Sequence, residues 1–431
     1  MEIILEHVRS FSKRCDISLR PLTLLVGENS SGKSTFLSVV SSVLDGSRFP
    51  FNLGFNDPPY NLGTFDTIAT YRGGKYGRDD LFSIGFSVAK DGKEPRRTSM
   101  ATYGSDYGSV VLRKVTSSTE DGDLSLEISN KAGLVSGSVS LRSGGEGFDF
   151  QQKIGEVGRY NQLQLKSLLL DAALRSLRQK KKNLGHPEME SVYRLLQMSE
   201  PPYATSYSFA PIRSKPRRTY DELSEEYTPE GDHIPTLLAR LLRQEANSAD
   251  SARVQRALLR FGQESGLFKT INVKKLGKKV TDPFQLQVAG AGPPVNLTDV
   301  GYGVSQALPI IVQSVLKTTS KVLLMQQPEV HLHPRAQAAL GSFFSELAAD
   351  EDRIIVMETH SDYLVDRVRQ EVAKGTIAPE RVLILFFSKP QLDTAVFAVR
   401  VDAQGNVEDA PQEYRAFFLQ EELNLFSRTG A

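Results

Sequence analysis

Residues 27–34 of this chain read GENSSGKS, which is the spacing G-x-x-x-x-G-K-[ST] of a phosphate-binding loop. The flanking residues suit the motif, because the apolar run 21–26 predicts a buried strand and residues 35–40 begin a helix. In such a loop the backbone N–H groups and a helix N-terminus face an anion. The motif therefore constrains the fold to a strand, a loop and a helix in direct succession, and it predicts a nucleoside triphosphate site.

The residue types in the loop match the chemistry of a phosphate site. Gly27 and Gly32 allow the backbone to turn tightly. Lys33 supplies a positive charge to the β- and γ-phosphates, and the Ser34 hydroxyl is predicted to reach a bound Mg²⁺. Further phosphate contacts are predicted for Asn29, Ser30, Ser31 and Thr35.

Composition limits the alternatives. The 431 residues are 40% hydrophobic and 24% charged, which is typical of a globular chain of two or three domains or of one domain with insertions. The sequence has no apolar run of about 18 residues and begins with a strand-like segment rather than a signal peptide, so we expect a cytoplasmic protein without membrane contact. Cys15 is the single cysteine, which excludes an internal disulfide and a zinc site built from several cysteines. The net charge of +1 creates no general attraction for nucleic acid.

Patterning along the chain predicts three parts, at 1–155, 156–270 and 271–431. The first holds the loop and a β subdomain with strands at 81–88, 107–115, 124–128 and 134–141. The second is a helical insertion, with helical spacing at 158–200 and 234–261 around a proline-rich joint. The third returns to α/β, with buried strands at 322–325 and 353–357 on either side of a helix at 335–349, and ends in a C-terminal tail.

Three further segments resemble motifs of ABC-type ATPase heads, the group that contains RecF, SMC and OLD-family proteins. Residues 323–334, LLMQQPEVHLHP, resemble the Walker B strand and D-loop. Residues 299–306, DVGYGVSQ, resemble the signature motif, and residues 356–361, VMETHS, resemble the switch-histidine segment. The resemblance covers most of the chain, with residues 207–220 resembling the bacterial members. It implies an α/β fold, namely a P-loop ABC-type ATPase head with an inserted β subdomain and a helical insertion.

The resemblance also implies the cofactors and the oligomeric state. ATP and Mg²⁺ are expected, together with a homodimer or higher homo-oligomer in which each nucleotide lies between the P-loop of one subunit and the signature segment of the other. Gly303, Ser305 and Gln306 are then expected to contact the nucleotide bound by the partner. His360 is expected to sense the γ-phosphate.

Two positions depart from the pattern of the group. The acidic residue expected to hold Mg²⁺ through its water shell is Gln326, and the one expected to polarise the attacking water is Gln327. In the bacterial members this segment usually resembles E-Q-P-E, so Gln326 is the unexpected residue, and whether it is natural or introduced stays open. An amide neither carries charge nor takes a proton, so we expect nucleotide binding with slow hydrolysis. Glu329 is the nearest carboxylate, and it either assists hydrolysis or shapes the loop.

The expected function is that of an ATP-dependent conformational switch or scaffold for a separate effector protein, a nuclease or toxin, in bacterial antiphage defence or DNA transactions. The alternative is a nucleotide-binding scaffold with little or no hydrolysis. A self-contained OLD-type nuclease requires a further domain, for which the residues after His360 are too few. A transporter subunit is disfavoured by the long insertions and by the lack of an L-S-G-G-Q-like signature.

Several smaller features keep two interpretations each. Basic clusters are either solvated faces or contacts for DNA phosphates, so DNA stays an open partner. His331 and His333 are either part of the D-loop or a metal-binding pair. The resemblance places residues 11–14 at the adenine base, but Phe11 is alternatively a core residue. Residues 62–67 and 72–74, which occupy the region expected for the Q-loop, contain no glutamine. The basic clusters are Arg175, Arg178 and Lys180–Lys182; Arg213, Lys215, Arg217 and Arg218; and Lys274, Lys275, Lys278 and Lys279.

Overall fold

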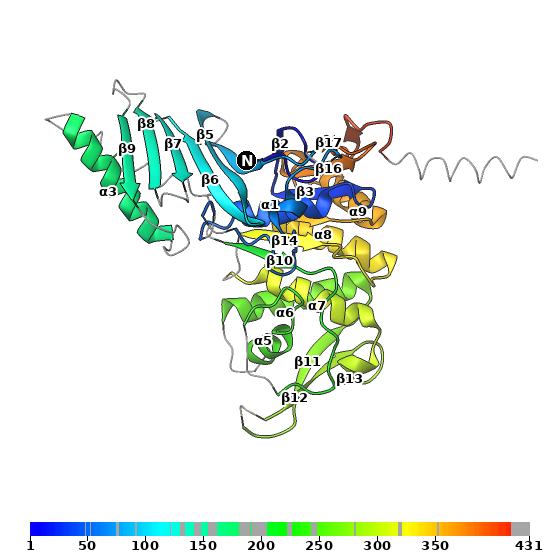
Figure 1. Ribbon diagram of the computed structural model, residues 1–431. Coiled ribbons are helices and arrows are strands. Elements are labelled where there is room, and N and C mark those ends of the chain that lie inside the picture. Colours follow the sequence, from blue (N-terminus) through cyan, green and yellow to red (C-terminus); the bar gives the residue numbers. More distant parts are fainter. Residues whose placement is uncertain are drawn as a thin grey trace, which may run out of the picture.

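The structure is a computed structural model with three parts, a central α/β body, a β wing on one side and a mainly helical lobe on another (Figure 1). It describes residues 1–47, 49–51, 53–74, 77–90, 93–120, 122–129, 134–141, 148–153, 162–180, 190, 205–221, 226–242, 248–279, 282–317, 321–350 and 353–414. In this part of the chain, no helix is long and apolar enough to cross a membrane.

The central body is built on a seven-stranded sheet in the order β10-β14-β15-β3-β16-β17-β18. The first five strands run parallel, and the last two pair antiparallel. Parallel strands buried on both faces need near-continuous apolar sequence, which the predicted strand segments supply. The bounds are β10 Ser206–Phe209, β14 Val322–Gln326, β15 Ile354–Glu358, β3 Leu22–Gly27, β16 Val382–Ser388, β17 Ala395–Val401 and β18 Val407–Glu408.

Both faces of this sheet are covered, so neighbouring residues of one strand enter two different cores. Leu324 belongs to the core that includes Phe36 of helix α1, whereas Leu323 belongs to the core that includes Phe344 of helix α8. This follows from the alternation of side chains along a strand. The helices of the body are α1 Lys33–Val43, α8 Pro334–Asp350 and α9 Asp362–Ala373, with the short elements α2 Phe65–Ile68 and η3 Pro379–Arg381.

The β wing is an eight-stranded antiparallel sheet in the order β2-β1-β4-β5-β6-β7-β8-β9, and α3 packs along it beside β9 (Figure 1). In β7, Leu124, Leu126 and Ile128 alternate with exposed residues, as a sheet with one buried face requires. The bounds are β1 Glu2–Glu6, β2 Cys15–Ser18, β4 Leu81–Lys90, β5 Lys93–Asp106, β6 Ser109–Ser118, β7 Gly122–Ser129, β8 Leu134–Leu141, β9 Phe148–Lys153 and α3 Gln162–Lys180.

The structure confirms the strands predicted at 81–88, 124–128 and 134–141. The strand predicted at 107–115 begins too early, because Tyr107 and Gly108 both have positive φ and form the turn between β5 and β6. β5 itself was not predicted. Its polar residues, which include Thr98, Ser99 and Thr102, gave no apolar run to mark it.

The third part combines α5 Ile234–Leu241, α6 Ala249–Ser265 and α7 Tyr302–Val315 with a small sheet of β11 Thr270–Lys275, β12 Phe284–Ala289 and β13 Val295–Asn296, followed by η2 Leu297–Asp299. Local sequence sets the ends of α6: the Ser248 side chain accepts a hydrogen bond from the N–H of Ser251, and Gly266 ends the helix with φ of 72°. The range 156–270 holds β10 as well as helices. It therefore contributes to the central sheet and is not solely a helical insertion.

Candidate nucleotide-binding site

The P-loop joins β3 to α1, and its two glycines are required by geometry. Gly27 has φ of 132° and Gly32 has φ of 103°, a region that residues with a Cβ rarely adopt. A Cβ at Gly27 would lie 2.1 Å from the carbonyl oxygen of Phe387 on β16. At Gly32 it would lie 3.0 Å from Oγ1 of Thr394 and 3.2 Å from the ring of Phe11. The loop is therefore pressed against the neighbouring backbone and side chains.

Lys33 lies inside the curve of the loop. Its Nζ donates to the carbonyl oxygen of Gly27 at 2.9 Å and to that of Glu28 at 2.6 Å, and the residue is only 3% exposed. Burial lowers the pKa of Lys33, and the nearby Glu358 carboxylate opposes this effect. The ammonium is thus held where a phosphate-binding lysine is needed.

A cleft of about 700 Å³ opens beside the P-loop, and it carries more positive than negative side chains. Arg9, Arg78 and Lys389 line it together with Lys33, against the carboxylates of Asp66 and Glu358. Such a balance favours a polyphosphate. Sequence reasoning missed the first three cations because they are remote from the recognised motifs, and only the fold brings them to the loop.

The cleft contains a candidate surface for the base, at a place other than the one considered from the sequence. Tyr71 lines the cleft, is 51% exposed and lies under the guanidinium of Arg78, whose Cζ is 5.0 Å from the ring centroid. Phe11, in contrast, has no exposed surface and packs in the core. The interpretation of Phe11 as a core residue is confirmed, and its interpretation as a contact for the base is wrong.

Glu358 places a carboxylate beside the hydroxyl of the P-loop serine. The Ser34 hydroxyl donates to Oε2 of Glu358 at 2.8 Å, and Nζ of Lys33 is 4.0 Å from Oε1. Glu358 ends β15 and pairs in register with Gln326, the last residue of β14. Sequence reasoning missed Glu358 because it looked for acids only at the end of β14. The available signal was a carboxylate at the end of the strand that leads to His360.

The donor atoms at this point suit Mg²⁺, which prefers oxygen ligands from few protein groups. They are the hydroxyl of Ser34 and the carboxylate of Glu358, which both line the cleft, whereas Gln326 pairs with Glu358 in the sheet but is not among the described residues that line it. In the described ranges, this site included, no group of three or more His, Cys, Asp or Glu side chains suits a metal ion. His331 instead contacts Tyr302 edge to face, with ring centroids 5.1 Å apart.

Glu329 supports the loop that carries His360. It is 7% exposed, and its Oε1 accepts a hydrogen bond from the backbone N–H of His360 at 2.7 Å. Burial raises the pKa of Glu329, although the His360 N–H and the charge of Arg213 act in the opposite direction. Glu329 is not among the described residues that line the P-loop cleft. This geometry favours a loop-shaping role over direct assistance in hydrolysis.

His360 follows β15 directly and is exposed at the same strand end as Glu358. Its pKa is lowered by partial burial and then by the positive charge of Lys33. The imidazole is therefore held in its neutral form at neutral pH, with a donor and an acceptor nitrogen. Gln327 leaves the end of β14 with φ of 46°, and its N–H donates to the carbonyl oxygen of Glu358 at 2.8 Å.

Arg213 was expected in a basic surface cluster, and the structure corrects this because the residue is 1% exposed. Its guanidinium donates to the carbonyl oxygens of Gln327 at 3.3 Å and Pro328 at 3.5 Å. Its backbone N–H donates to Oε1 of Gln306 on α7 at 3.3 Å. Burial lowers the pKa of Arg213 to about 10, against the attraction of Glu329. Arg213 therefore joins the signature helix to the segment after β14.

The signature segment begins α7 after Gly301, on a surface separate from the P-loop cleft. Tyr302 is 36% exposed, and a Cβ on Gly303 would lie 3.1 Å from the carbonyl oxygen of His331 in the D-loop. Ser305 is largely buried, and its hydroxyl donates to the carbonyl of Tyr302 at 2.8 Å. Gln306 has no exposed surface in the single chain and accepts a hydrogen bond from the Arg213 backbone, so its contact with nucleotide stays a prediction. None of the described residues that line the P-loop cleft belongs to α7.

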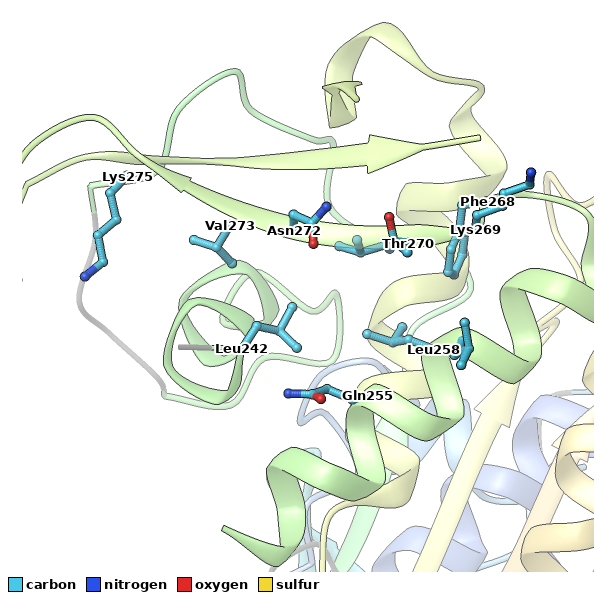
Figure 2. Close-up of a pocket in the computed structure, with 11 residues that line it drawn as sticks. Leu242, Gln255, Leu258, Phe268, Lys269, Thr270, Asn272, Val273 and Lys275 are labelled. Atoms are coloured by element: carbon cyan, nitrogen blue, oxygen red, sulfur yellow. The ribbon is translucent and has the colours of Figure 1, made fainter. Parts of the chain in front are cut away.

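A second pocket lies in the helical lobe, remote from the P-loop. It measures about 770 Å³ and lies between α6 and β11, where Leu258, Phe268 and Val273 contribute apolar surface (Figure 2). None of its lining residues belongs to the motifs recognised in the sequence. The P-loop cleft, rather than this pocket, is therefore the candidate site for a nucleotide.

A family model matches one part of the chain. Residues 199–366 match the family model described as "AAA domain, putative AbiEii toxin, Type IV TA system". The matched range includes β10, α7, β14 and the switch-histidine segment, whereas the P-loop precedes it. A comparison with curated proteins found no match.

Solved SMC head structures are similar to this chain at low identity. The SmcHead bound to the C-winged helix domain of ScpA is 10% identical, with 93% of this chain and 97% of that chain covered and a TM-score of 0.43. The SMC head domain from Thermotoga maritima is 10% identical, with 93% and 98% covered and a TM-score of 0.39. The Smc head domain with an extended coiled coil, bound to the C-terminal domain of ScpA derived from Pyrococcus furiosus, is 10% identical, with 98% of each chain covered and a TM-score of 0.43.

Proposed function

We propose that this chain, a P-loop ATPase head of the ABC and AAA type, binds ATP with Mg²⁺ and dimerises around the nucleotide. Each ATP would lie between the P-loop of one subunit and the segment Gly301–Ser305 of the other. Nucleotide state would then act as a conformational switch for a partner protein.

The observation that carries this proposal is the separation of the two half-sites in one chain. The P-loop cleft is lined by the P-loop, the start of α1, part of α2 and the end of β15, and no α7 residue described in the structure reaches it. The N-terminus of α7 lies instead beside the D-loop, where Tyr302 contacts His331. A second copy that presents this surface to the cleft would complete the enclosure of the triphosphate.

The residues fit the two cofactors. The backbone N–H groups of the P-loop and Lys33 would bind the phosphates, and Ser34 together with the Glu358 carboxylate would hold Mg²⁺. When bound, the metal supplies positive charge that neutralises the phosphate oxygens. His360, held neutral, offers a hydrogen bond toward the terminal phosphate while Glu329 fixes its backbone.

Light scattering of the purified protein tests the dimer. We expect a monomer in EDTA and a dimer at saturating ATP and Mg²⁺, since the nucleotide supplies much of the interface. Lys33→Ala is the binding control and should stay monomeric under both conditions. A wild-type protein that remains monomeric at saturating ATP and Mg²⁺ would refute the nucleotide-sandwich dimer.

A second candidate function is a nucleotide-binding scaffold with little or no hydrolysis. The observation that favours it is the pair of neutral residues, Gln326 and Gln327, at the positions expected to be acidic. Release of inorganic phosphate by the wild type and by Gln326→Glu separates the two functions. Turnover that appears or rises in the variant supports a switch ATPase, and its absence in both proteins supports the scaffold.

We further propose a cytoplasmic role in bacterial antiphage defence or DNA transactions, with a separate nuclease or toxin as effector. The family model supports this in part, because its description names a putative AbiEii toxin and a toxin–antitoxin system. Copurification with the product of a neighbouring gene, with and without ATP, tests the partner. An effector that fails to copurify in either state would count against this role.

DNA binding is a separate proposal that depends on surface charge. Lys274, Lys275, Lys278 and Lys279 are all exposed on β11 and the segment after it. Neutralising this cluster should weaken DNA binding and reduce its salt dependence. An unchanged salt slope would exclude the cluster as the contact.

A further inference from the structure

We propose that Glu358 is the metal-holding carboxylate of this ATPase, and that it supplies from β15 the charge that Gln326 lacks on β14. This inference rests on the proposed binding of ATP with Mg²⁺ and assigns one residue of that site. It also changes the interpretation of Gln326. The site keeps one carboxylate, that of Glu358, although residue 326 is neutral.

The contacts of Glu358 point to the metal position rather than to a general counter-ion role. Its nearest polar partner is the Ser34 hydroxyl, which donates to Oε2 at 2.8 Å, whereas Nζ of Lys33 is 4.0 Å from Oε1. A carboxylate that served only to neutralise Lys33 would make its closest contact with the ammonium. The serine hydroxyl is the protein ligand that a P-loop offers to Mg²⁺. Its contact with Glu358 gathers a hydroxyl and a carboxylate oxygen at one point.

The strand order explains how β15 can take over this task. β15 lies between β14 and β3, so its carboxyl end is nearer to the P-loop than that of β14. Gln326 and Glu358 are paired in register, and paired residues in adjacent strands direct their side chains to the same face of a sheet. A carboxylate at position 358 of β15 therefore lies at the same edge and on the same face of the sheet as one at position 326 of β14, but one strand closer to Ser34.

Burial of Glu358 strengthens the attraction between its carboxylate and a cation in the cleft. Glu358 is 6% exposed and lines the P-loop cleft. A carboxylate shielded from water interacts more strongly with a nearby cation than an exposed one does. The neighbouring Glu329 does not compete for this role, because it is not among the described residues that line the P-loop cleft.

The experiment measures how Mg²⁺ changes nucleotide affinity, which does not depend on turnover. A fluorescent ATP analogue is titrated into the full chain in EDTA and again with Mg²⁺. For Glu358→Gln, whose amide oxygen still accepts the Ser34 hydrogen bond, we expect the Mg²⁺-dependent gain in affinity to fall by about tenfold or more. Affinity in EDTA should stay near that of the wild type. Restoring an acid in the double variant Gln326→Glu/Glu358→Gln should recover part of the gain.

Matched variants separate this inference from the proposed function. Glu346→Gln alters another carboxylate, which is paired with Arg260 on a different surface, and should leave both titrations unchanged. A Glu358→Gln protein that keeps the wild-type Mg²⁺ gain would overturn the assignment while the proposed function stands. Equal loss of affinity in EDTA and in Mg²⁺ would also overturn it, since that result marks a role in shaping the loop. A wild-type protein that binds no nucleotide in either condition would overturn both.

Discussion

The buried contact network of Arg213 makes a prediction about stability that a double-mutant cycle can test. Arg213→Met removes the hydrogen bonds to the carbonyls of Gln327 and Pro328 and leaves Glu329 buried without its positive neighbour. Glu329→Gln retains an acceptor for the His360 N–H but leaves the guanidinium without an opposite charge. The double variant contains neither charge. The cycle therefore measures the interaction of the two groups.

The magnitude follows from the pKa of Arg213, which burial lowers well below its ordinary value, to about 10. At about 1.36 kcal/mol per pKa unit, holding this charge in the fold costs about 3 kcal/mol even with Glu329 nearby. Removing one partner of a buried pair typically costs about 3–5 kcal/mol, whereas replacing both by neutral groups is often nearly neutral. We expect each single variant to lose about 3 kcal/mol and the double variant to lose less than either.

Thermal unfolding followed by far-ultraviolet circular dichroism is the assay, because the sequence contains no tryptophan. At about 2 °C per kcal/mol, each single variant should lower Tm by about 6 °C. The pKa of Glu329 is raised by burial, so its protonated form is favoured in the fold and its stabilising contribution is lost as pH rises through the folded pKa. The loss in Arg213→Met should therefore shrink at acid pH. Additive single variants, with a coupling below about 0.5 kcal/mol, would refute the reasoning.

Three further predictions concern the P-loop cleft. Gly27→Ala should abolish ATP binding and lower Tm by several degrees, because its Cβ would lie 2.1 Å from the Phe387 carbonyl oxygen. The control Gly375→Ala replaces a glycine that has positive φ but open space around it, so the protein should lose only about 1 kcal/mol of stability from backbone strain. Equal losses of stability in the two variants would contradict the argument. Because the pKa of His360 is lowered in the fold, its contribution to stability is present above its ordinary pKa and is lost as pH falls through the folded pKa. His360→Gln should therefore flatten the dependence of Tm on pH in this acid range. An unchanged dependence would exclude the effect. Tyr71→Ala should weaken ATP binding by about fivefold or more and triphosphate binding by less, as measured by competition titration, because its ring is the candidate surface for the base.

The parts of this site that follow from local chemistry were predictable from the sequence. The P-loop was predictable because its strand, glycines, lysine and helix are consecutive in the sequence, and the structure places α1 directly after Gly32. Glu358 and Arg9 were not, since only the strand order and a loop folded back on α1 bring them to the cleft. Arg213 was expected at the surface because its neighbours in sequence are basic. No local pattern distinguishes an arginine that donates to buried carbonyls from one that faces solvent.

The position of β3 in the central sheet has a consequence for synthesis of the chain. Both of its neighbours, β15 and β16, lie in the last fifth of the sequence, although β3 itself ends at Gly27. At ribosomal rates of about 5–20 residues per second, the strand waits roughly 15–65 s for its first partner. During that interval its apolar edges are available to chaperones or to wrong pairings. A competent P-loop thus forms only after β15 and β16 have been made, so the ability to bind nucleotide reports that synthesis has passed Ser388.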